Sequence, residues 1–136
     1  MVAYSFKKQF VPLIRQGYKR QTIRAVSLRR HVRVGELIQL YTAMRTAHCA
    51  RILPDVTCID VCPVLILFDD AMRITRIDTA GIPVRDLDAF AVRDGFQDIA
   101  DMAAFWEDAH GTMLQFEGVL IEWAYPGNVE AMEVAA

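Results

Sequence analysis

Cysteine is scarce in this chain of 136 residues, which holds three cysteines and no Cys-x-x-Cys pair. An odd count without paired spacing argues against the disulfide framework of a secreted protein and favours a reducing compartment. Long apolar runs are also missing, since the longest, Val61 to Phe68, is far below the roughly 20 residues of a membrane helix. The residues before Lys7 are too few for a signal peptide. We therefore expect a cytoplasmic protein with no membrane partner.

The sequence also lacks the motifs of several enzyme classes. It has no glycine-rich phosphate loop, no His-Glu-x-x-His pair and no serine, histidine and aspartate in the order of a hydrolase triad. Cys58 and Cys62 lie in a segment with strand-like composition, where roughly 3.3 Å per residue places their sulfurs more than about 10 Å apart. We expect buried thiols here, no metal site and no cofactor.

Acidic residues are almost absent from the first part of the chain. Residues 1–51 contain eleven Lys and Arg and one acid, Glu36, which gives a net charge of +10. Residues 52–136 contain four basic and sixteen acidic residues, which gives −12 and brings the whole chain to −2. Such polarity attracts a polyanion to one surface and repels it from the other. Ordinary pairing between the two halves explains the same pattern and stays open.

The overall composition is that of one globular domain. The chain is 54% hydrophobic and 24% charged, and a domain of this length buries enough surface to hold a core without disulfides. No repeat or linker interrupts it before Pro126, where a Pro-Gly-Asn turn begins. The sequence predicts a single domain over residues 1–125 and a C-terminal tail over residues 126–136.

The order of expected elements favours the α+β class. The spacing of Phe6, Phe10 and Ile14 predicts a short N-terminal helix. Two later helices are expected to begin after Asp86 and Asp98, and a closing strand pair with a bulge at Gly118 follows them. β-branched and aliphatic residues predict strands between these helices, at residues 21–26, 36–42, 47–53, 56–68 and 72–77, with Pro63 splitting or bulging the longest. We expect a small mixed β-barrel flanked by helices.

The candidate chemistry gathers just after the first expected helix. Lys19, Thr22 and Arg24 follow one another within six residues. On a strand, Thr22 and Arg24 face the same side, and the Lys19 side chain in the preceding turn can reach the same place. An ammonium, a hydroxyl and a guanidinium that converge suit a phosphate, a carboxylate or the polar edge of a base. Exposure of the same side chains to water is the alternative.

A longer pattern carries a resemblance to a known family. Lys19, Thr22 and Arg24 belong to a Gly-x-Lys-x-x-Thr-x-Arg string that begins at Gly17, and an Asp94-Gly95-Phe96 sequence precedes the last expected helix. Together with Phe10, Ile14, Ile23, Val34-Gly35-Glu36, Tyr41, Arg45-Thr46, Cys49, Phe105-Trp106 and Trp123, this pattern resembles the ASCH domain family from about Tyr4 to Trp123.

The resemblance implies a PUA-like fold and a cleft for RNA or modified nucleosides. Some small members are described as amidohydrolases that remove the acetyl group of N4-acetylcytidine. Their catalytic positions correspond to Lys19, Thr22 and Asp94 here, and the family residue at the third position is a Glu. Aspartate is shorter by one carbon–carbon bond, about 1.5 Å, and a misplacement of about 1 Å costs on the order of a hundredfold in rate.

Further residues are candidates for ligand contacts. Tyr18 is a candidate for base stacking. Arg29, Arg30 and Arg33 lie in the loop after the expected strand and are expected either to contact phosphates or to be solvated, and Arg45 matches the family pattern. Phe105 and Trp106 are expected in the core, and His110 at a helix end.

These observations favour a domain that binds RNA or a modified nucleotide in a basic cleft formed by Lys19, Thr22, Arg24 and Asp94. The alternative is a small hydrolase that acts through the same residues, either as an amidohydrolase on a modified nucleoside or as a ribonuclease. A further alternative is an adaptor whose charge polarity serves protein contacts. The sequence leaves homo-oligomerisation open.

Overall fold

The computed structural model describes residues 2–126 and confirms the α+β class. The predicted tail therefore lies, apart from Pro126, outside the described residues. The strands are β1 (Val2–Phe6), β2 (Gln21–Ala25), β3 (Leu37–Thr42), β4 (Ala50–Arg51), β5 (Val56–Phe68), β6 (Ile74–Thr79), β7 (Ile82–Pro83) and β8 (Gln115–Trp123). The helices are the 3-10 turn η1 (Lys8–Phe10), α1 (Val11–Arg15), α2 (Leu87–Arg93) and α3 (Ile99–His110).

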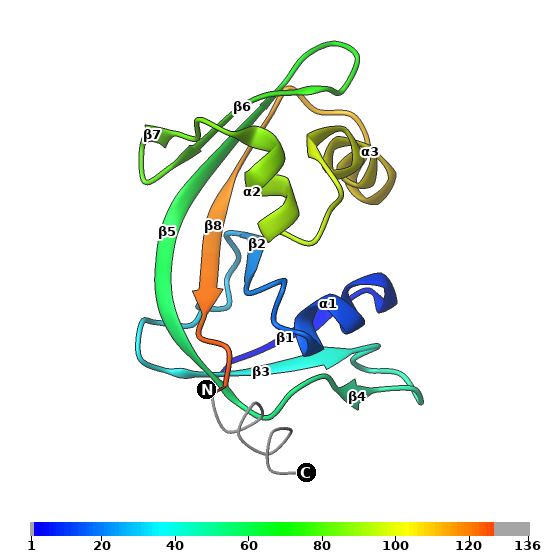
Figure 1. Ribbon diagram of the computed structural model, residues 1–136, viewed down its shortest axis with the longest axis vertical. Coiled ribbons are helices and arrows are strands. Elements are labelled where there is room, and N and C mark those ends of the chain that lie inside the picture. The colour runs from blue at the N-terminus through cyan, green and yellow to red at the C-terminus, as the bar shows by residue number, and fades with distance from the viewer. Residues whose placement is uncertain (1, 127–136) are drawn as a thin grey trace.

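The long strand β5 connects the two halves of the molecule. Its first residues pair with β3, and its later residues pair with β6 on one side and with β8 on the other. The register against β8 shifts between Cys58 and Asp60, so the irregularity lies before Pro63 and β5 runs through Pro63 unbroken. Figure 1 shows β5 curving from β3, β4 and α1 at one end to α2 and α3 at the other.

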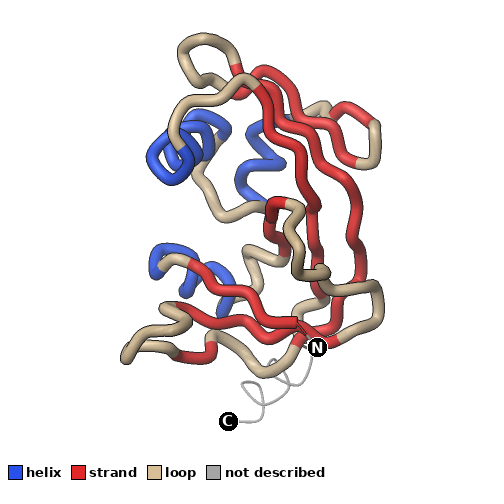
Figure 2. Tube along the Cα trace, turned by 180° about the vertical axis from the view of Figure 1, so that it is seen from behind, coloured by secondary structure: helices blue, strands red, loops and turns tan. Residues whose placement is uncertain are grey.

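The sheet does not close into the small barrel expected from the sequence. The path runs β1-β3-β5-β6-β7, and β8 pairs with β5 and carries β2 as its other neighbour. Among residues 2–126 no pairing joins β2 or β7 to β1, so the eight-stranded sheet stays open. Figure 2 shows the same arrangement from behind, with the helices on one side of the curved strands.

The two later helices agree with their sequence signals. The Asp86 side chain caps α2 by accepting a hydrogen bond from the Ala89 amide. The Asp98 side chain caps α3 by accepting one from the Asp101 amide. The first helix is shorter than predicted because Phe6 belongs to β1, which pairs in parallel with β3. The spacing of Phe6 to Phe10 matched a helical period by coincidence, since the alternation of β1 is what buries Phe6 and Tyr4.

Two predicted strands differ in extent. The strand expected at residues 47–53 is only the short β4, because the residues around it form turns and bends and the pairing with β3 covers two residues. The closing strand pair is a single strand, β8, whose register against β5 is continuous from Glu122 to Gln115. The bulge predicted at Gly118 is therefore wrong, and the glycine has a different role.

Gly118 allows β2 to approach β8 closely. It lies opposite Ala25 of β2, and a Cβ at this position would stand 2.4 Å from the Arg24 carbonyl oxygen and 2.7 Å from the Phe116 ring. Both contacts are far inside van der Waals distance, so a methyl group would push β2 outward. The position of the strand that carries Thr22 and Arg24 thus depends on a glycine of β8.

We expect Gly118→Ala to destabilise the protein by about 1–3 kcal/mol, the usual cost of overpacking. Chemical denaturation followed by circular dichroism measures this loss. Glu117→Ala is the matched control, because Glu117 is an exposed neighbour on the same strand. An equal effect of the two substitutions would contradict the assigned contact.

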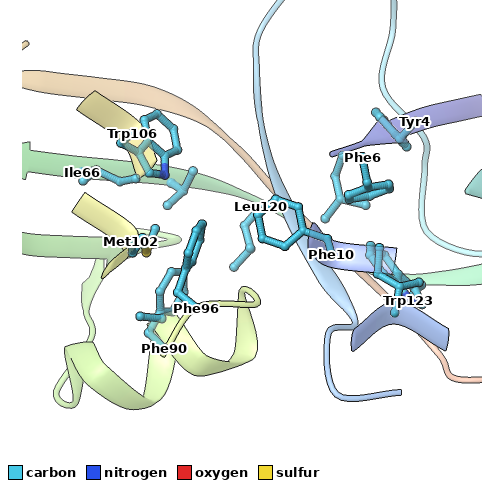
Figure 3. Packing of buried hydrophobic residues seen from close by; sticks show 14 of the residues in the cluster. Tyr4, Phe6, Phe10, Ile66, Phe90, Phe96, Met102, Trp106, Leu120 and Trp123 are labelled. Carbon is cyan, nitrogen blue, oxygen red and sulfur yellow. The ribbon is translucent and has the colours of Figure 1, made fainter. Parts of the chain in front are cut away.

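The hydrophobic core follows β5 and β8 and has two parts. In Figure 3, Trp106 and Ile66 lie on one side of Leu120, and Phe6 and Trp123 lie on the other. The first part packs α2 and α3 onto the sheet, and the second packs β1 and α1. Side chains of η1 and α3 meet between these two parts, and the candidate site lies there.

Candidate functional site

A pocket of about 310 Å³ lies where η1 and the ends of β1 and β2 approach α3. We call it the first pocket, and its polar lining includes Lys19, Thr22, Arg24 and Asp94. Its volume is at the lower end of the range of roughly 300–1,000 Å³ that small-molecule sites occupy. The convergence predicted from the sequence is therefore present. It joins Thr22 and Arg24 of β2, and Lys19 just before that strand, with Asp94 at the end of α2.

Lys19 contacts Asp94 across a sequence separation of 75 residues. The Lys19 ammonium donates to the Asp94 backbone carbonyl at 2.5 Å, and Asp94 Oδ1 lies 3.7 Å from Nζ. Both side chains are buried, and the ammonium also lies 4.9 Å from the centre of the Phe10 ring. Asp94 is the C-cap residue that directly follows α2, so the Asp94 carbonyl is available to a donor outside the helix.

A buried glutamine supports the aspartate. Gln21 Nε2 donates to Asp94 Oδ1 at 3.2 Å, and Gln21 is only 5% exposed. The side-chain hydrogen bond to the Asp94 carboxylate therefore comes from Gln21. Lys19 is held mainly by its hydrogen bond to the Asp94 backbone carbonyl. The shorter aspartate side chain still reaches the site, because the backbone of residue 94 itself lies against the lysine.

Gly95 belongs to the Asp94-Gly95-Phe96 string, and the geometry explains why a glycine stands next to Asp94. Its φ of +101° lies in the region that favours glycine, and a Cβ there would stand 2.9 Å from Lys19 Cδ and from the Phe10 ring. The chain turns sharply after Asp94 and leaves no room for a side chain. The Asp-Gly sequence thus brings the backbone of residue 94 to the lysine.

Thr22 and Arg24 face the same side of β2, as the strand alternation predicts. Arg24 Nε donates to Thr22 Oγ1 at 3.1 Å, and the same guanidinium donates through a terminal nitrogen to the Ser5 carbonyl at 2.7 Å. The guanidinium carbon lies 5.1 Å from the Tyr4 ring centre and 4.9 Å from that of Phe6. Arg24 thus ties β2 to β1 beside the pocket.

Burial dominates the electrostatics of these groups. It lowers the pKa of Lys19, an effect that the Asp94 carboxylate partly offsets and Arg24 reinforces. It raises the pKa of Asp94, which Lys19 and Gln21 partly offset. Burial also lowers the pKa of Arg24. A larger fraction of Lys19 than of an exposed lysine is therefore neutral at a given pH, and the site places Lys19 and Arg24 around one carboxyl group.

Of the other residues predicted to contact a ligand, some line a pocket and some do not. Arg29 and Arg30 line a second pocket that adjoins the first. Tyr18 is 71% exposed and lines neither pocket. Arg33 and Arg45 are exposed and line neither pocket, and Arg45 lies in the turn between β3 and β4. The structure therefore does not bring these last three residues to the cleft.

Six Phe and Trp side chains line the first pocket, and two of them, Phe105 and Trp106, were expected in the core. Phe10, Phe96 and Phe105 contact one another with ring centres 5.2–5.5 Å apart, and they join η1 to α3. Trp106 is buried as expected but also lines the pocket, together with His110 four residues later. The spacing of Phe105 and Trp106 to Ala109 and His110 on one helix face is the signal for this wall.

Glu36 holds the basic loop between β2 and β3. Its two carboxylate oxygens accept from Arg30 at 2.7 and 2.9 Å, and the Arg33 amide donates to one of them. These bonds lower the pKa of Glu36 from 4.5 to about 2, the Arg30 hydrogen bond being the largest cause. A carboxyl whose pKa is lowered by folding stabilises the fold above pH 4.5 and loses this effect as pH falls towards 2.

We expect Arg30→Ala to raise the pKa of Glu36 towards 4.5 without reaching it, since the Arg33 amide remains. Carboxyl carbon shifts followed by NMR against pH measure the change. An unchanged titration of Glu36 would contradict the role given to Arg30.

Within residues 2–126 no three His, Cys, Asp or Glu side chains are grouped so that they could hold a metal ion. Of the helices described, none has the length and apolar character needed to cross a membrane.

Comparison of the whole chain with protein-family models, with curated proteins and with solved structures finds no match.

Proposed function

We propose that this protein is an ASCH-type domain of the PUA-like superfamily that binds RNA or a modified nucleotide, with the open sheet as its form of the family's barrel. One observation carries the proposal: Lys19, Thr22, Arg24 and Asp94 line a single pocket whose other wall is aromatic. An aromatic wall offers stacking to a base at roughly 1–3 kcal/mol, and buried donors next to it suit the polar edge of the base.

The charge of the cleft supports the same assignment. Lys7, Lys19 and Arg24 line the first pocket, and Asp94 is the only acidic residue that lines it among residues 2–126. Lys7 lies with its ammonium 5.1 Å from the centre of the Phe105 ring, at the aromatic wall. A cleft of this charge attracts an anionic ligand, and its affinity falls as salt rises because bound phosphates release counterions.

Tryptophan fluorescence gives a direct test. The chain has two tryptophans, of which Trp106 lines the pocket and Trp123 lies in the other part of the core. Trp123 Nε1 has no hydrogen-bond partner within residues 2–126, so Trp123→Phe removes an unpaired donor and leaves Trp106 as the reporter. Short single-stranded homopolymeric RNAs, one for each base, are titrated into this variant.

We expect at least one RNA to change the Trp106 emission, and we expect Lys19→Met to abolish the change. The logarithm of the binding constant should fall linearly with the logarithm of the salt concentration, with a slope of about −0.7 for each phosphate contacted. If none of the RNAs changes the emission at low salt, or if the Lys19 variant binds as well as the parent, the proposal is wrong. Calorimetry on the unsubstituted chain checks that Trp123→Phe did not alter binding.

Hydrolysis of an acylated nucleoside is the second candidate, favoured by the lowered pKa of Lys19 next to a hydroxyl that lines the same pocket. In this reaction the neutral Lys19 amine accepts the Thr22 hydroxyl proton while Oγ1 attacks the acyl carbon. The amide C–N bond breaks, and the proton passes to the leaving nitrogen. Water then hydrolyses the threonine ester, releases the carboxylic acid and restores Thr22.

Binding stands first because the catalytic hydrogen bond is not formed. Thr22 Oγ1 accepts from Arg24 Nε, and no hydrogen bond joins it to Lys19 within residues 2–126. Release of acetate from N4-acetylcytidine separates the two candidates. Turnover that disappears in Thr22→Val establishes the hydrolase, and a lack of turnover in the wild-type chain removes it.

A further inference from the structure

A second pocket, of about 530 Å³, adjoins the first between β1 and the loop from residue 26 to residue 34. Its polar lining includes Arg24, Ser27, Arg29, Arg30 and His31. No carboxylate of residues 2–126 lines it. The second pocket therefore combines three guanidinium groups with an absence of acidic side chains, which is the composition of an anion site.

The two pockets meet at Arg24 and Ala25, which line both of them. The Arg24 guanidinium lies over the rings of Tyr4, which lines the second pocket, and Phe6, which lines the first. Its Nε and one terminal nitrogen donate to Thr22 and Ser5, and its other terminal nitrogen makes no hydrogen bond to a described residue. One ligand can therefore contact this guanidinium while occupying both pockets.

The loop that forms the second pocket is fixed on β1 and β2. His31 bonds to the Tyr4 hydroxyl through Nδ1 and to the Ala25 carbonyl through Nε2, both at 2.8 Å. The Val32 amide donates to the same hydroxyl at 3.2 Å. Because the Ala25 carbonyl only accepts, His31 donates to it through Nε2. The histidine thus positions the loop against Tyr4 of β1 and Ala25 of β2.

The arginines of this loop differ in their availability. Glu36 neutralises Arg30 with two hydrogen bonds. The Arg29 guanidinium makes no ion pair or hydrogen bond to any residue from 2 to 126, although it lines the pocket. Arg33 is exposed in the same loop, likewise without a side-chain ion pair to these residues, and does not line the pocket. A ligand in the second pocket can therefore bind the Arg29 guanidinium without breaking an existing ion pair.

We propose that the second pocket binds the phosphate of a nucleotide whose base lies in the first pocket, with Arg29 and Arg24 as the phosphate contacts. The ligand class is thus a ribose phosphate, either a nucleoside monophosphate or a residue of an RNA chain, in preference to a free nucleoside. This inference rests on the proposed function, because it requires a base in the first pocket.

The test compares the four common ribonucleosides with their 5′- and 3′-monophosphates. The Trp106 emission of the Trp123→Phe chain is the readout, in about 0.15 M salt, where charges farther apart than roughly 8 Å are screened. We expect at least one monophosphate to bind about ten-fold or more tightly than its nucleoside. The 5′ and 3′ series show on which side of the ribose the second pocket lies.

Arg29→Ala should bring the affinity of that monophosphate down to that of the nucleoside and leave the nucleoside itself unaffected. Arg33→Ala is the matched control, since it removes the same charge from the same loop outside the pocket, and we expect it to change neither affinity by more than about two-fold.

Equal affinity of nucleosides and monophosphates overturns the inference, and so does an equal loss in the two arginine variants. In both cases the base still binds in the first pocket, and the proposed function survives. If no nucleoside, monophosphate or RNA binds, the proposed function itself fails, and the phosphate pocket fails with it.

Discussion

Asp94→Ala is expected to destabilise the protein by about 3–5 kcal/mol, the usual cost of leaving one partner of a buried ion pair alone. Lys19 is 3% exposed and has Asp94 Oδ1 at 3.7 Å, whereas Arg24 adds a second cation to the same site. Removal of the carboxylate leaves an ammonium that must either stay charged in a buried place or lose its proton. Denaturant unfolding at neutral pH measures the loss.

The loss should shrink as pH rises. The pKa of Lys19 is lowered by burial in the folded chain and stays near 10.5 in the unfolded chain. The unfolded chain therefore binds more protons between the two values, and stability rises with pH across that window. Without Asp94 the folded pKa falls further, so the variant gains more than the wild type as pH approaches 10.5. A loss that is independent of pH would contradict this explanation.

A double variant separates stability from function. Replacement of a buried ion pair by apolar residues of similar size is often neutral or stabilising by about 1–4 kcal/mol, so Lys19→Met with Asp94→Leu should recover most of the stability. RNA binding should be lost in the double variant, as in Lys19→Met, because the Lys19 ammonium is missing from the pocket. Asp108→Ala, at an exposed position of α3, should change stability by no more than about 0.5 kcal/mol.

The meeting of Lys19 and Asp94 was predictable, but the way they meet was not. The resemblance joined two segments 75 residues apart, and the alternation of β2 placed Thr22 and Arg24 on one side. The hydrogen bond from Lys19 to the backbone carbonyl of residue 94, and the support by Gln21, depend on how α2 ends against β2. A spacing pattern contains no information on such a contact.

Non-local pairing explains most of what the sequence did not predict. β1 is a strand because it pairs in parallel with β3, some 36 residues later, and this partner is not visible in the local period. The second pocket likewise depends on the bond between Tyr4 and His31, which are 27 residues apart. Local capping by Asp86 and Asp98 was predicted correctly, because a cap acts within one helical turn.

Arg24→Ala is expected to weaken RNA binding by about 30- to 150-fold, which corresponds to about 2–3 kcal/mol for a lost charged hydrogen-bonding group. Arg24 lines both pockets. It also fixes β1 and β2 relative to each other, because its guanidinium donates hydrogen bonds to Thr22 of β2 and to Ser5 of β1. Its removal takes away a ligand contact and leaves the Ser5 carbonyl without this donor. Titration of Trp106 emission with a short single-stranded RNA measures the change, at a temperature where circular dichroism shows the variant folded.

Arg24→Lys decides whether the charge or the shape of the side chain matters. A lysine keeps the positive charge, but its ammonium cannot span Thr22 and Ser5 as the planar guanidinium does, nor stack between Tyr4 and Phe6 in the same way. We therefore expect the lysine variant to recover less than half of the lost binding free energy. Full recovery would mean that Arg24 acts only as a charge, and the two pockets would then not need a shared guanidinium to bind one ligand.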